Sequence, residues 1–99
     1  MNSPAEQRAA FDQFSRGERE LYCIGSATEA KNLDTLTFRK MADNKRQIAA
    51  WIRYEEAECW RKENKLESSK VVSLSYAELH SYLMSMPAEF RGCYSLEVI

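Results

Sequence analysis

The chain contains few of the residues on which common active sites depend. Among its 99 residues are three glycines, one histidine and three cysteines. Gly17, Gly25 and Gly92 lie far apart, so they form no glycine-rich loop for binding phosphate. His80 has no local partner at the spacing of a nucleophile and its base. The cysteines form no CxxC or Cys/His cluster, which excludes the short-range ligand spacing of structural zinc sites. The sequence therefore predicts no enzymatic activity, no metal and no cofactor.

Long hydrophobic runs are also missing. No stretch approaches the ~20 apolar residues that a membrane-spanning helix needs. The first residues are polar and lack the apolar centre of a signal peptide. An odd number of widely spaced cysteines is typical of reduced thiols rather than of a disulfide framework. We therefore expect a cytoplasmic protein without a membrane segment.

Length and charge limit the number of domains and the class of partner. A chain of 99 residues has room for one hydrophobic core, so residues 1–99 are expected to form a single domain. The net charge of −1 argues neither for nor against nucleic acid as a partner. Residues 34–54 carry five basic and two acidic side chains, a local charge of +3. Residues 55–69 carry five glutamates and three basic residues, a local charge of −2.

The segment 35–66 is the most informative part of the chain, because its apolar residues recur at helical spacing. At about 100° per residue, nine side chains fall within one stripe: Phe38, Met41, Ala42, Ile48, Ala49, Ile52, Cys59, Trp60 and Leu66. This pattern predicts one long amphipathic helix. The helix begins either near residue 35 or near Asp43, because residues 35–39 also alternate in the manner of a strand.

Shorter elements are predicted on both sides of this helix. Ser3 and Glu6 form a capping box with a proline between them, so a helix should run from Pro4 to about Ser15. A second capping box at Ser75 predicts a helix that continues through residue 86 and stops at Pro87. Three short apolar runs predict strands at residues 21–24, 71–74 and 93–99.

Taken together, these elements predict a helix-rich α+β fold. In it a long central amphipathic helix, an N-terminal helix and a C-terminal helix pack against a small sheet. An all-α bundle, in which the three apolar runs are buried connections, is the alternative. The chain resembles no family closely enough for us to name one.

Three arginines provide the main functional lead. On a helix, Arg39, Arg46 and Arg53 lie seven residues apart and form one cationic edge beside the apolar stripe. Trp51 and Tyr54 lie on the opposite side, where they are either core residues or part of an interface. Exposed Arg, Trp and Tyr are enriched among the residues that contribute most to protein interfaces.

We therefore expect a small, non-enzymatic cytoplasmic binding protein that docks on a larger protein as an adaptor, regulator or inhibitor. A partner that itself processes nucleic acid fits the segregated basic and acidic segments. The alternative is a regulator that binds DNA or RNA directly, with the arginine edge on the phosphates. The near-zero net charge and the acidic segment that follows favour the protein partner. The oligomeric state is left open.

Overall fold

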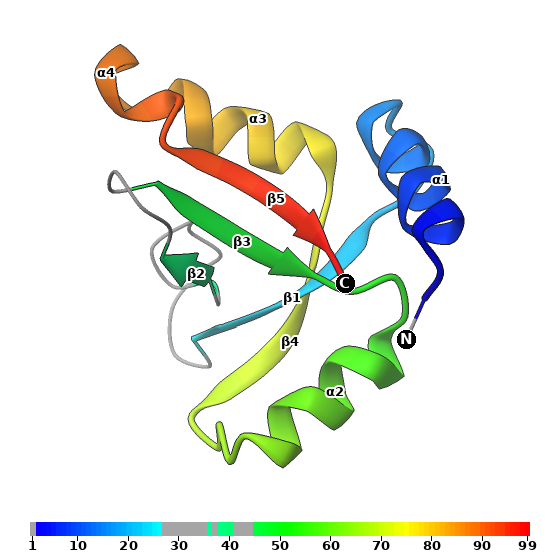
Figure 1. Ribbon diagram of the computed structural model, residues 1–99. Helices are drawn as coiled ribbons and strands as arrows, with labels where there is room; N and C mark the ends of the chain where they lie inside the picture. The colour runs from blue at the N-terminus through cyan, green and yellow to red at the C-terminus, as the bar shows by residue number, and fades with distance from the viewer. Residues whose placement is uncertain (1, 27–35, 37, 41–44) are drawn as a thin grey trace.

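Two small sheets form the centre of the computed structural model, which describes residues 2–26, 36, 38–40 and 45–99 (Figure 1). In the first sheet, β1 (Leu21–Ser26) pairs antiparallel with β4 (Ser69–Leu74). In the second, β3 (Arg46–Ala50) lies between β2 (Phe38–Lys40), which is antiparallel to it, and β5 (Tyr94–Val98), which is parallel. Tyr22 and Trp51 join the sheets through two backbone hydrogen bonds, with N···O distances of 2.9 and 2.7 Å.

Alternation along the strands places a hydrophobic core on each side of the sheets. The larger core takes alternate residues of the strands, namely Leu21, Cys23, Ile48, Ala50, Val72, Leu74, Leu96 and Val98. The second core takes the residues between them, namely Tyr22, Ile24, Ala49, Trp51 and Val71. β1, β3 and β4 therefore contribute residues to both cores.

Helices cover these two faces. α1 (Pro4–Ser15) and α3 (Tyr76–Met84) contribute Phe14 and Leu79 to the larger core. α2 (Tyr54–Glu63) contributes Ala57 and Trp60 to the second core. A short helix, α4 (Ala88–Arg91), precedes β5. In Figure 1 the strands accordingly lie between α3 above and α2 below.

The elements predicted from local signals are confirmed. Ser3 accepts a hydrogen bond from the Glu6 N–H at the start of α1, and Gly17 has a positive φ of 74° just beyond its end. Ser75 and Glu78 form the complete capping box of α3. The three predicted strands are present as β1, β4 and β5, and α3 ends at Met84, two residues earlier than predicted.

The prediction of a long central helix is wrong. Of the described residues between 35 and 66, only those of α2 are helical, while two stretches belong to β2 and β3. Ile48 and Ile52 misled the prediction because a separation of four residues places two side chains on one face of a helix and also on one face of a strand. The wholly apolar run 48–52 is typical of a strand that is buried on both sides. The all-α alternative is wrong for the same reason, and residues 35, 37 and 41–44 lie outside the described part of the chain.

The bounds of α2 follow from the residues on either side of it. Arg53 is extended, with φ −120° and ψ 140°, so the helix begins only after it. Lys65 has a left-handed φ of 56°, which ends the helical path. Arg61 then donates hydrogen bonds to the carbonyl oxygens of Leu66 and Ser69, at 3.1 and 3.5 Å, and so links α2 to the start of β4.

Candidate interaction surfaces

The three arginines of the predicted edge lie on different elements. Arg39 is in β2, where its backbone pairs with Gln47, and Arg46 opens β3. Arg53 precedes α2 as its N-cap residue. They therefore do not share the single helical edge that the sequence predicted, because the helix that was to carry them is absent.

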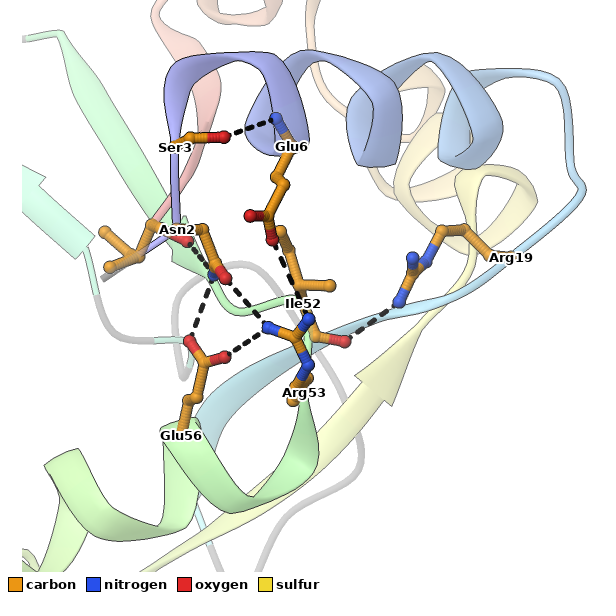
Figure 2. A network of polar contacts seen from close by, with 8 residues as sticks. Asn2, Ser3, Glu6, Arg19, Ile52, Arg53 and Glu56 are labelled. Carbon is orange, nitrogen blue, oxygen red and sulfur yellow. Dashed lines mark hydrogen bonds and ion pairs between the residues drawn. The ribbon is translucent and has the colours of Figure 1, made fainter.

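Arg53 belongs to a polar network at the start of α2 (Figure 2). One of its guanidinium nitrogens donates to the side chains of Asn2 and Glu56, both at 2.8 Å. Glu6 of α1 lies 3.7 Å from its second terminal nitrogen. The ion pair with Glu56 and the charge of Glu6 raise the pKa of Arg53. Carboxylates of the same chain therefore stabilise its positive charge.

Asn2 extends this network to the end of the described chain. Its side-chain amide nitrogen donates to the carbonyl oxygen of Ile99 and to Glu56, each at 3.1 Å. Arg19 adds a bond of 2.9 Å to the carbonyl oxygen of Ile52, as Figure 2 shows. Arg53 therefore links the segment before α1 to the start of α2, and Asn2 links both to residue 99.

Arg46 contacts an aromatic residue of the neighbouring strand. Its guanidinium carbon lies 5.8 Å from the centre of the Tyr94 ring, and one of its nitrogens lies 3.4 Å from the Tyr94 hydroxyl. This arrangement suits a cation–π contact across the parallel pair β3 and β5.

Trp51 and Tyr54 have different environments, although both were predicted on one side of a helix. Trp51 is only 3% exposed and packs against Trp60 in the second core, with ring centres 5.4 Å apart. Tyr54 is 46% exposed and contacts the ring of Tyr22 edge-on. Trp51 is therefore a core residue, whereas Tyr54 remains available at the surface.

The exposed face of α3 is distinguished by the absence of charge. Five of its residues are exposed, namely Tyr76, Ala77, His80, Ser81 and Met84, and none of them is an Asp, Glu, Lys or Arg. Glu78 is the only charged residue of this helix, and it is engaged in the capping box. An exposed helix ordinarily carries charged residues on its outer face, as α2 does. Tyr76 and Met84 are 41% and 52% exposed, so apolar surface is open to solvent at both ends of this helix.

Aromatic rings continue this face from α3 onto α1. The ring of Phe14 meets Tyr76 edge-on at 5.7 Å and lies 6.4 Å from the ring of Phe11, which is exposed. On α3 itself, Tyr76 stacks on His80 with ring centres 6.4 Å apart. Where the two helices meet, a shallow hollow of about 380 Å³ is lined by Ser15, Arg16, Gly17, Tyr76, Ala77 and His80. We call the exposed residues of α3 together with Phe11 and this hollow the α3 face.

The histidine and the cysteines lie on different parts of the fold. His80 is on the α3 face, Cys59 is exposed on α2 and Cys23 is buried in β1. In the described part of the chain, no three His, Cys, Asp or Glu side chains are arranged to hold a metal ion. Within the same ranges, no helix is long and apolar enough to cross a membrane.

Comparison with known proteins gives no further guide to the function. No protein-family model matches the chain, and no curated protein matches it.

The sequence contains a signal for the α3 face. Tyr76, His80 and Met84 recur every four residues within a predicted helix that has one charged residue. Leu79 and Leu83 lie three residues beyond Tyr76 and His80, so they border this stripe on the side that packs on the core. An apolar stripe that extends from the core residues onto exposed positions is typical of an interface.

Proposed function

We propose that the chain is a non-enzymatic binding protein that docks on a larger protein through the α3 face, as an adaptor, regulator or inhibitor. The observation that carries this proposal is the uncharged, partly apolar surface of α3. Residues of this kind are typical of the buried centre of protein interfaces, from which charged residues are depleted. The proposal replaces the arginine edge with a different surface and keeps the class of partner.

The hollow between α1 and α3 supports a protein rather than a nucleic acid as the partner. Its walls include the Tyr76 ring and the Ala77 methyl group, which suit an apolar side chain of a partner. Arg16 is its only Lys or Arg, and it is already paired with Glu18 at 3.4 Å. A surface for phosphates needs several basic side chains, because neutralisation of phosphate charge dominates such affinity.

A charge placed on the α3 face tests the proposal. Met84→Lys adds a cation at an exposed position, so the fold should persist while an apolar interface is lost. Ser68→Lys adds the same charge at an exposed position between α2 and β4 and is the matched control. Affinity capture from the native host, followed by identification of the bound protein, should recover one partner with the wild type and with Ser68→Lys but not with Met84→Lys. Equal recovery by both variants would exclude the α3 face.

A further inference from the structure

β5 lies at the edge of its sheet and pairs with β3 on one side (Figure 1). At the start of this pair, the Arg46 N–H donates to the carbonyl oxygen of Cys93 at 2.6 Å. At its end, the Ile99 N–H donates to the carbonyl oxygen of Ala50 at 2.8 Å. In a parallel pair, alternate residues of a strand direct both backbone groups to the same neighbour. Residues 93, 95, 97 and 99 therefore face β3, whereas residues 94, 96 and 98 face the other side.

The backbone on that other side is open at Leu96 and Val98. In the described part of the chain, no backbone hydrogen bond outside the pair with β3 involves either residue. Every residue of β5 is also at least partly exposed, although Leu96 and Val98 pack on the larger core. β1 and β3, by contrast, each contain fully buried residues. β5 therefore presents accessible donors and acceptors along its outer edge.

Two other strands have features that discourage further pairing. β2 is only three residues long, and two of them are Arg39 and Lys40. β4 carries the exposed Lys70, and Arg61 of α2 donates to its Ser69 carbonyl oxygen at 3.5 Å. β5 contains no lysine, arginine or proline, and its register with β3 runs without a bulge. An edge of this kind can accept another strand.

We infer that β5 pairs antiparallel with β5 of a second copy of the chain, about a two-fold axis at Leu96. In this register the strand is complementary to itself. Leu96 exchanges both backbone hydrogen bonds with its counterpart, and Val98 lies opposite Tyr94 of the second copy. The side chains of these three residues pack on the larger core in each copy, so the pairing joins the two cores along one face.

The charges and the length of β5 select this axis. With the axis at Leu96, Ser95 lies opposite Glu97 of the second copy, and the pair occurs twice. An axis at Glu97 would set two carboxylates directly opposite each other, which is unfavourable. An axis at Ser95 would place Val98 opposite Gly92, which lies outside the strand. Only the axis at Leu96 pairs all five residues of β5 without opposing like charges.

This interface goes beyond the proposed function, because it is formed by β5 and does not use the α3 face. A dimer of this kind carries two α3 faces and can therefore engage two partner molecules. Either surface can fail without the other. Met84→Lys, which is designed to disrupt the α3 face, should dimerise as the wild type does.

Amide hydrogen exchange tests the pairing at the backbone itself. The N–H groups of Ser95 and Glu97 are bonded to β3, so they should exchange slowly at every protein concentration. Those of Leu96 and Val98 should exchange fast in dilute protein and become protected in concentrated protein. A pair of five-residue strands is a small interface, so exchange is compared by NMR between about 20 µM and about 1 mM chain. Sedimentation over the same range should show the mass rising toward that of a dimer.

Substitutions at the exposed Ser95 test the register. Ser95→Glu sets like charges opposite Glu97 at two places, so it should weaken dimerisation roughly two- to thirty-fold. Ser95→Lys should strengthen dimerisation, because it creates two pairs of opposite charge. Ser68→Glu and Ser68→Lys make the same changes of charge at an exposed position before β4 and should leave dimerisation unchanged.

Three results would overturn the inference. A chain that stays monomeric at about 1 mM would exclude the second copy and leave the edge to a segment of another protein. Protection of Leu96 and Val98 that does not depend on concentration would show that the edge is covered within one chain. Equal effects of Ser95→Glu and Ser68→Glu would show that the dimer forms elsewhere.

Discussion

Replacement of Ser75 by alanine should destabilise the domain by about 1 kcal/mol, within the range of roughly 0.5–2 kcal/mol measured for such caps. The Ser75 hydroxyl accepts from the Glu78 N–H at 3.1 Å, and the Glu78 carboxylate accepts from the Ser75 N–H at 3.0 Å. Alanine removes the first bond and leaves a partly buried N–H without its acceptor. The second bond and the buried residues Leu74 and Leu79, placed as a hydrophobic staple, remain, so α3 should weaken without disappearing.

Urea and thermal denaturation measure this effect. For a domain of this size, about 1 kcal/mol corresponds to a fall in Tm of roughly 4–8 °C. Ser81→Ala is the control, because it is the same substitution at an exposed position in the same helix. Ser3→Ala should cost less than Ser75→Ala, since the Ser3 cap is exposed and the Glu6 carboxylate faces Arg53. A Ser75→Ala midpoint equal to that of Ser81→Ala would refute the reasoning about the cap.

Three further predictions follow from burial and from the shifted pKa values. Ala50→Asp should abolish cooperative folding in circular dichroism and urea titration, because Ala50 is fully buried in β3; a native midpoint would mean that the strand is misplaced. The hydrogen bonds from Arg61 lower the pKa of Glu58, so their stabilisation should be complete above about pH 4.5 and be lost as the pH falls through the lowered value. Glu58→Gln should therefore show a flatter fall in stability below pH 4.5, and an unchanged slope would contradict this. Glu63→Gln should speed the alkylation of Cys59 by iodoacetamide at pH 7.5, because it removes the carboxylate that raises the pKa of the thiol. Mass spectrometry measures the rate, and a slower reaction would contradict the hydrogen bond between Cys59 and Glu63.

Elements that depend on neighbouring residues could be predicted from the sequence. The cap at Ser3 and the capping box at Ser75 each involve residues within one four-residue segment, and Pro87 limits the extent of α3. The β-branched content of β4 is similarly local. In each case the physical cause lies inside the segment, so the sequence alone was sufficient.

The arrangement of β3 could not be predicted in the same way. It pairs with β2 on one side and with β5 on the other, where Arg46 pairs with Tyr94 across 48 positions of the chain. The spacing of Ile48 and Ile52 is compatible with a helix and with a strand, and only the distant partner strand decides between them. The arginine edge was lost with the helix, because seven-residue spacing places side chains together only on a helix.

The α3 face was only partly visible in the sequence. The four-residue spacing of Tyr76, His80 and Met84 was visible, but which face of α3 points outward is fixed by the strands beneath it. The ring contact between Trp51, which follows β3, and Trp60 of α2 depends on the fold. A prediction with both residues on one helix could not bring their rings together.

Site-specific photo-crosslinking tests the central claim, that the α3 face is the surface that contacts a protein partner. Benzoyl-phenylalanine is introduced at position 80 in one variant and at position 54 in another, and each is irradiated in a lysate of the native host. Both His80 and Tyr54 are exposed, but only His80 lies on the α3 face. We predict a discrete protein adduct from position 80 and none from position 54. An adduct from position 54 without one from position 80 would contradict the account.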